Sequence, residues 1–291
     1  MKNLKAILFS IIGVCLLFTG CHKEQTEVGN AKVKVHINDF SVEQEELSGT
    51  KDAIADYSGV NAVTLAFYTT DGTEQYQVTQ LRSDATTYTT FGDFDLSLPM
   101  GSYTMVVVAY KTQDDSPFVL TGLTAAAFTG AHAFETFATT QAVNITSTSD
   151  VNLSATLSRI VAKLQVLSTD GKTANAASIR MTMSAGGKGF NPATGLATSN
   201  TGFANTVSIS ADTGSTSNSI SYLFLASDEQ TMDVAIDVLD SDGNSISHRE
   251  VSNVPLKRNR VTKLTGSLYS TDAGSAFQLS TAWLSDTTIT F

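Results

Sequence analysis

Short apolar stretches, many of them alternating with polar residues and ending in turn residues, restrict this chain to a fold built from β-strands. In Lys32–Asn38 the alternation is strict and places Val33, Val35 and Ile37 on one face, which is the pattern of a half-buried strand. Three other apolar stretches end in an Asp-Gly pair, which suits the tight type I′ turn of a β-hairpin. We interpret them as recurring hairpins, at Ala62–Gly72, Ile160–Gly171 and Met232–Gly243.

Further strand-like segments follow one another to the end of the chain. They are Gln75–Leu81, Thr87–Leu98, Tyr103–Tyr110, Ala142–Ile145, Val151–Leu157, Ser178–Ser184, Phe203–Ser210, Ile220–Ala226, Ser245–Val251, Arg260–Ser270, Phe277–Trp283 and Thr287–Phe291. The Ala-rich segment Leu123–Ala138 is the best helix candidate, and Gly186–Asn200 is predicted to be a flexible loop. Val42–Ser58 carries several acidic residues without strand periodicity and is predicted to be an exposed loop.

Many short strands with frequent turns and almost no helix are typical of β-sandwiches. Charged residues make up only 16% of the chain, while Ser and Thr are abundant, which favours an all-β surface protein. The length suits two sandwiches of ~120–130 residues each. We therefore predict an all-β protein whose two sandwiches meet near residue 158.

The first twenty residues have the organisation of a bacterial secretion signal. Lys2 and Lys5 precede an apolar run, Ala6–Phe18, that is shorter than the ~20 residues of a membrane-spanning helix. Small residues directly before Cys21 resemble the lipobox of bacterial lipoproteins. We therefore expect residues 1–20 to be removed and Cys21 to carry lipid as the first residue of the mature protein.

A lipid on Cys21 would hold an otherwise soluble protein at the bacterial outer membrane, because a diacylated Cys is a stable two-chain anchor. The other cysteine, Cys15, would leave with the signal, so the mature chain could form no internal disulfide. Residues 21–30 would be a lipidated tether, in which Lys23-Glu24 resembles short signals for surface export in Bacteroidetes. The alternative is an uncleaved anchor in which Cys21 has no role.

The chain is acidic, with 18 Lys and Arg against 28 Asp and Glu. Two of the basic residues lie in the predicted signal peptide, so the mature protein would have a net charge of −12. This charge argues against nucleic acid or anionic lipid as the main partner.

No residues have the spacing of a catalytic or metal site. The four histidines, His22, His36, His132 and His248, are far apart in the chain, and the HExxH pattern is absent. Asp240–Asn244 resembles half of a calcium loop but stands at a hairpin position, where a plain turn is expected. We therefore expect no metal, no cofactor and no enzymatic activity.

Several segments together resemble the fimbrillins of Bacteroidetes type V pili and related fimbrillin-like surface lipoproteins. They are the lipobox at Cys21, Ala31–Ile37 (AKVKVHI), the acidic loop, Ala62–Tyr68 (AVTLAFY), Leu157–Val166 (LSRIVAKLQV) and Val254–Tyr269 (VPLKRNRVTKLTGSLY). The resemblance implies two transthyretin-like β-sandwich domains, which we assign to residues 31–157 and 158–291.

The resemblance also implies a mechanism of assembly. Fimbrillins are exported as lipoproteins, a trypsin-like protease cuts the loop after the first strand, and the strand is lost. A strand from a neighbouring subunit, usually its C-terminal segment, then fills the groove by β-strand addition. Here the removable strand would be Lys32–Asn38, and the donor would be Phe277–Phe291. The usual Arg is missing from the loop, so Lys51 is the proposed processing site.

Three functions stay open at the level of the sequence. The first is a polymer-forming fimbrial subunit, with other subunits and the outer membrane as partners. The second is a non-polymerising surface lipoprotein of the same fold, a fimbrial anchor or tip adhesin, which would keep an uncut loop. The third is a glycan-binding surface module, which would need an exposed aromatic platform. In addition, Phe277–Phe291 can be read as an ordinary last strand rather than a donor.

Overall fold

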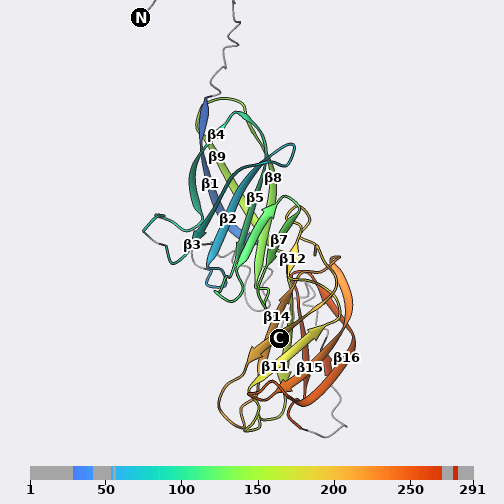
Figure 1. Ribbon diagram of the computed structural model, residues 1–291. Coiled ribbons are helices and arrows are strands. Elements are labelled where there is room, and N and C mark those ends of the chain that lie inside the picture. Colours follow the sequence, from blue (N-terminus) through green and yellow to red (C-terminus); the bar gives the residue numbers. More distant parts are fainter. Residues whose placement is uncertain (1–28, 42–53, 55–56, 85, 271–277, 281–291) are drawn as a thin grey trace, which may run out of the picture.

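The computed structural model describes residues 29–41, 54, 57–84, 86–270 and 278–280, and no helix occurs among them (Figure 1). The strands are β1 (Asn30–Ser41), β2 (Ala62–Thr69), β3 (Glu74–Leu81), β4 (Asp93–Pro99), β5 (Gly101–Tyr110), β6 (Phe118–Gly122), β7 (Ala125–Phe128), β8 (Thr136–Ile145), β9 (Val151–Arg159), β10 (Ala162–Ser168), β11 (Ser178–Met183), β12 (Gly189–Phe190), β13 (Phe203–Ser208), β14 (Asn218–Leu223), β15 (Glu229–Leu239), β16 (Ser245–Lys257), β17 (Val261–Gly266) and β18 (Gln278–Ser280). The predicted all-β class is confirmed.

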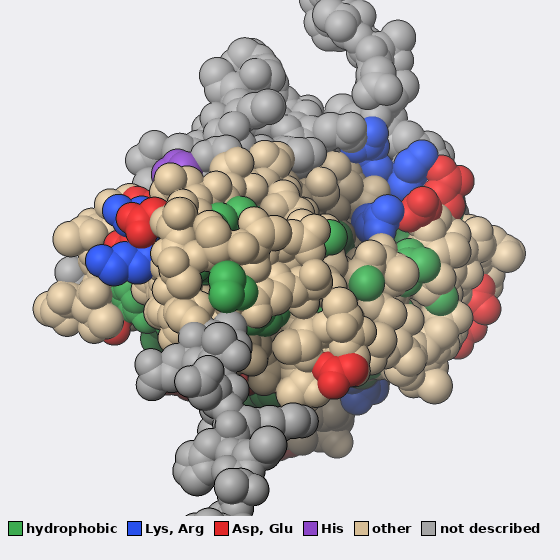
Figure 2. All heavy atoms as spheres, turned by 90° about the horizontal axis from the view of Figure 1, so that it is seen from above, with side chains coloured by type: hydrophobic (Ala, Val, Ile, Leu, Met, Phe, Trp, Pro, Cys, Tyr) green, Lys and Arg blue, Asp and Glu red, His purple; other side chains and the backbone are tan. Residues whose placement is uncertain are grey.

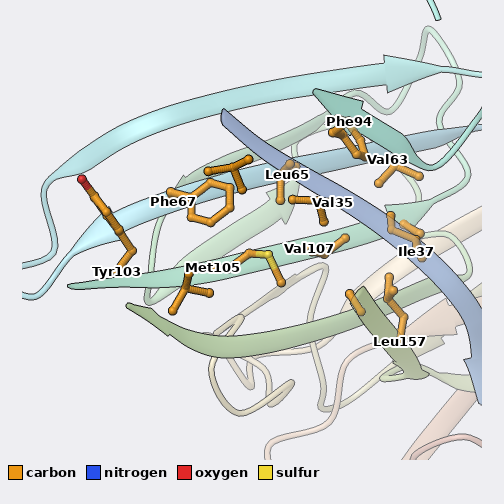
Figure 3. Close-up of a cluster of buried hydrophobic side chains, with 14 of the residues drawn as sticks. Val35, Ile37, Val63, Leu65, Phe67, Phe94, Tyr103, Met105, Val107 and Leu157 are labelled. Atoms are coloured by element: carbon orange, nitrogen blue, oxygen red, sulfur yellow. The ribbon is translucent and has the colours of Figure 1, made fainter. Parts of the chain in front are cut away.

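The first half of the chain forms a seven-stranded sheet in the order β3-β2-β5-β8-β9-β1-β4. Its strands enclose one apolar core, to which β1, β2, β4, β5, β8 and β9 all contribute buried side chains. Figure 3 shows the blue strand β1 crossing this core, with Val35 and Ile37 directed at side chains from the neighbouring strands.

Two strands of this sheet are buried on both faces, which explains their nearly continuous apolar sequence. In β2 and β5 alternate residues face the first core, and the residues between them face a second, aromatic cluster. The small sheet β12-β7-β6 contributes Ala126, Phe128 and Phe190 to this second cluster. Because β12 comes from the second half of the chain, the cluster joins the two halves.

The second half contains two four-stranded sheets, β14-β10-β17-β18 and β13-β11-β15-β16. Apolar residues from both sheets form a third core, so this part is a β-sandwich. Residue 158 lies at the end of β9, two residues before Ile160 and the strands of the second half. The assignment of domains to 31–157 and 158–291 remains a prediction.

The turns at Asp71-Gly72 and Asp242-Gly243 are not of the predicted type I′. Outside glycine, the described residues with positive φ are Asn253 and Asn259, so neither Asp71 nor Asp242 has the backbone that type I′ requires. The loops after β2 and β15 instead use a single left-handed glycine each, with φ of +84° at Gly72 and +85° at Gly243. Both still connect antiparallel neighbours and are hairpins.

The third Asp-Gly pair does not form a hairpin at all. After β10 the chain passes through Asp170-Gly171 to β11, which lies in the opposite sheet. The predicted hairpin at Ile160–Gly171 was therefore wrong. The apolar alternation of β10 is real, but its partners are β14 and β17, which come much later in the chain.

The predicted helix at Leu123–Ala138 was also wrong. This segment holds β7 and the start of β8, and Ala126 and Phe128 alternate with more exposed residues. The alanines are explained by close packing against the aromatic cluster and not by helix propensity. In Gly186–Asn200 the predicted flexible loop contains β12, whose Phe190 is 0% exposed.

Candidate functional site

The first strand is the candidate site because its inward face is part of the core. Its alternation was predicted from the sequence and is confirmed: the inward side chains are 0–1% exposed, while those between them are exposed. The inward side chains are Ala31, Val33, Val35 and Ile37, and the outward ones are Lys32, Lys34 and His36. The face shown in Figure 2 has only scattered apolar side chains.

Backbone pairing on both sides holds β1 in the sheet. Residues Asn30–His36 pair antiparallel with β4, and Val33–Ser41 pair parallel with β9, with a bulge after Ile37. Without β1, both β4 and β9 would present unpaired N–H and C=O groups beside an open apolar core. Unpaired strand edges of this kind bind any strand of suitable sequence. The geometry thus defines a groove that is filled by the chain's own first strand.

The chain segment that follows residue 53 is held firmly against this core. Ile54 is 3% exposed and belongs to the same cluster as Ile37, so the prediction of an exposed loop over Val42–Ser58 was wrong at this residue. Arg82 binds three carbonyl oxygens of the segment, those of Ile54 at 2.8 Å, Tyr57 at 3.0 Å and Val60 at 3.0 Å.

Tyr57 ties the same segment to a buried ion pair. Its hydroxyl donates to Glu135, 2.9 Å from each carboxylate oxygen, and Glu135 pairs with Arg159 at 2.7 Å. Burial, together with the nearby Glu135 carboxylate, raises the pKa of Tyr57 to about 12. Arg159 also donates to Asn259 in the second half, at 3.1 Å. The segment after the predicted processing site Lys51 is therefore connected to both halves of the molecule.

The C-terminal side of the molecule is held by a second carboxylate. Asp170 accepts hydrogen bonds from the Ser267 hydroxyl and from the amides of Leu268, Tyr269 and Ser270, at 2.6–2.9 Å. Burial alone would raise the pKa of Asp170, but these hydrogen bonds outweigh it and keep the pKa below its ordinary value. Beyond this point β18 pairs with β17 over three residues at the edge of its sheet.

A cleft of about 720 Å³ lies where the end of β9 meets the second half. Its lining residues are Ser158, Arg159, Ile160, Ser227, Asp228, Glu229, Lys257, Arg258, Asn259 and Arg260. Opposite charges within the lining pair with each other, Lys257 with Glu229 at 2.6 Å and Arg258 with Asp228 at 2.7 Å. These pairs use both acidic residues of the lining and two of its four basic residues, and Arg159 pairs with Glu135.

The described histidines do not form a metal site. His36 contacts Asp93, His132 contacts Asn205, and His248 lies 2.8 Å from Asp237. Among the residues that the structure describes, no three His, Cys, Asp or Glu side chains gather as metal ligands would. Asp240 accepts from the amides of Asp242 and Asn244, which is the plain turn predicted for the calcium-like segment.

Several predicted features lie outside the described residues, namely the signal peptide at 1–20, Cys21, His22, the processing site Lys51, Trp283 and the strand Thr287–Phe291. Within the described part, no helix has the length and apolar character needed to cross a bilayer. Sequence reasoning missed Ile54 and Arg82. A single apolar residue in an acidic loop and an isolated arginine carry no periodic signal.

Two solved structures are similar in fold to this protein. One, described as a "putative adhesin" from Bacteroides ovatus, is 11% identical with a TM-score of 0.53, over 87% of this chain and 93% of that chain. Another is the fimbrial anchor protein Mfa2 from Porphyromonas gingivalis, 10% identical with a TM-score of 0.50, over 86% of this chain and 95% of that chain. The protein thus has a fimbrillin-like β-sandwich fold, as the sequence resemblance implied.

The chain belongs to a family of unknown function, DUF6562, whose model matches residues 24–290. No curated protein matches the sequence.

Proposed function

We propose that this protein is a fimbrial subunit exported as a lipoprotein and assembled by exchange of its first strand. The observation that carries the proposal is the position of β1, whose inward side chains complete the core and whose backbone is paired on both sides. A cut at Lys51 would leave β1 attached to Cys21 and its lipid. Only non-covalent contacts would then connect β1 to the rest of the protein.

The free energy of these contacts is large enough that β1 would leave only when another strand displaces it. Full burial of a Val or Ile side chain stabilises by ~1.5–3 kcal/mol, so Val33, Val35 and Ile37 together contribute roughly 5–9 kcal/mol as an upper estimate. This is comparable to the whole stability of a typical domain, about 5–15 kcal/mol. A cut strand would therefore stay bound until another strand displaces it. The C-terminal segment Phe277–Phe291 of a neighbouring subunit is the proposed donor.

A second candidate function is a non-polymerising anchor or adhesin of the same fold. Two observations favour it: the loop lacks the Arg that fimbrillins use for processing, and one solved structure of similar fold is a fimbrial anchor protein. In this case Lys51 would stay uncut, and the lipid on Cys21 would be permanent. Fimbrial partners or surface ligands would then bind to an intact first domain.

Mass spectrometry of the N-terminus of the surface protein, together with an unboiled SDS gel, distinguishes the two functions. A subunit of the polymer would begin at Asp52 and form ladders that survive mild SDS. An anchor would begin at a diacylated Cys21 and run as a single species. The matched control is Lys51→Gln, which abolishes both the Asp52 terminus and the ladders if Lys51 is the processing site. A mature surface protein with an unlipidated Cys21 would contradict the lipoprotein assignment in either function.

A further inference from the structure

One inward position of β1, that of Ile37, is flanked by a residue that does not belong to β1. Ile54 lies against Gly92, the residue directly before β4. A methyl group added at Gly92 would come within 2.6 Å of Ile54 Cγ2 and 3.7 Å of Ile37 Cβ. The side chains of Ile37 and Ile54 therefore flank the same glycine, one from the removable strand and one from the segment behind it.

Ile54 is held in this position by groups that would remain after a cut at Lys51. Its carbonyl oxygen accepts from Arg82 Nη2 at 2.8 Å, and the same guanidinium binds the carbonyls of Tyr57 and Val60. Arg82 is itself fixed, because its guanidinium stacks 4.2 Å from the ring centre of Phe91. Its amide also donates to the Asn61 carbonyl, at 2.8 Å. An incoming strand could therefore not push Ile54 aside without breaking several of these bonds.

Building on the proposed strand exchange, we infer that Ile54 is a specificity-determining residue of the groove at the Ile37 position. It limits the side chain at the Ile37 position of an incoming strand to about the size of isoleucine, and so helps to set that strand's register. A shift by one residue would turn the apolar face outward. A shift by two residues that places a side chain larger than isoleucine at this position would drive that side chain against Ile54.

The test uses the full chain with a protease recognition sequence placed within residues 42–53. After cleavage, the two pieces stay together through the non-covalent contacts of β1. Labelled peptides with the sequence of residues 30–41 compete with the bound β1, either native or carrying Ile37→Phe. Overpacking of a filled core site predicts that the wild-type chain binds the Phe peptide about 5- to 150-fold more weakly than the native peptide. Ile54→Ala opens space at this site and should remove most of this discrimination, leaving less than about threefold.

A second peptide provides the matched control. Val33→Phe places the same bulk on the same face of the strand, but away from Gly92, and its penalty should be equal in the wild-type and Ile54→Ala chains. If Ile54→Ala fails to fold, Ile54→Val removes one methyl group and should shift the discrimination in the same direction by a smaller factor. Arg82→Lys replaces the separate Nε and Nη2 donors by one ammonium nitrogen, so it cannot reproduce this arrangement of bonds and should weaken the discrimination while leaving Ile54 in the sequence.

The outcomes separate this inference from the proposed function. Selective relief of the Ile37→Phe penalty in Ile54→Ala supports the inference. Exchange of the native peptide with an unchanged Ile37→Phe penalty in all chains overturns it and leaves strand exchange intact. Failure of the native peptide to enter the cut wild-type chain overturns both.

Discussion

The contribution of the apolar core to the binding of β1 can be measured with the substitution Val35→Ala in the chain cut between β1 and residue 54. Val35 is 1% exposed and lies in the core that β1 completes. The substitution removes two methyl groups, worth ~1.6 kcal/mol in transfer free energy, and the cavity left behind raises the total to about 2–3 kcal/mol. The equilibrium constant for release of β1 should therefore increase roughly 30- to 140-fold.

The assay labels the β1 fragment and follows its release into an excess of unlabelled peptide of residues 30–41. Lys34→Ala is the matched control, because Lys34 is exposed on the outward face and keeps the same backbone pairing with β4 and β9. It should change release by less than about threefold, as expected for surface substitutions. Equal release of the two variants would refute the reasoning that the inward face holds the strand.

Three further predictions concern interactions that stabilise the rest of the molecule. Phe190→Ala should lower the free energy of unfolding by about 3–5 kcal/mol in urea titrations, because this ring is fully buried and stacks on Phe224 with ring centres 4.5 Å apart. An unchanged urea midpoint would contradict the view that the aromatic cluster holds the two halves of the chain together. Arg159→Met should cost about 3–5 kcal/mol because it leaves the buried Glu135 without its charge partner, and adding Glu135→Leu should restore most of that loss; a double variant no more stable than the single one would argue against the explanation. Asp170 has a lowered pKa when folded, so its contribution to stability is present above the unfolded pKa of about 3.9 and is lost as the pH falls through the folded value. Asp170→Asn should therefore be less stable than wild type at pH 6, with the difference shrinking towards pH 2, whereas a constant difference in thermal melts would exclude the carboxylate as the source.

The fold class followed from local patterns, and β1 shows why. Alternation with a period of two reports directly that one face of a strand is buried, whatever its partners are. Val33, Val35 and Ile37 could therefore be assigned to a core before any contact was known. The same holds for the turns at Gly72 and Gly243, where glycine supplies a left-handed backbone.

The predictions were wrong where the local composition was compatible with more than one structure. The alanines of Leu123–Ala138 are compatible with a helix and also with close packing in a sheet. The segment forms strands, in which alanine packs in the cluster of Phe128 and Phe190. Asp170-Gly171 has the composition of a hairpin turn, yet the chain crosses there between two sheets. The Asp170 carboxylate instead binds four consecutive residues that come about a hundred positions later.

By itself, the sequence determined that this protein is built from β-strands and that β1 has an apolar face. The reason is that alternating burial along a strand appears directly as alternation between neighbouring residues. Only the tertiary structure decided that β1 runs parallel to β9 and that Ile54 lies beside Gly92 and Ile37. It also decided that Arg82 holds Ile54 in place. These features depend on contacts between residues far apart in the chain, where many pairings bury similar apolar area and only the packed molecule selects one.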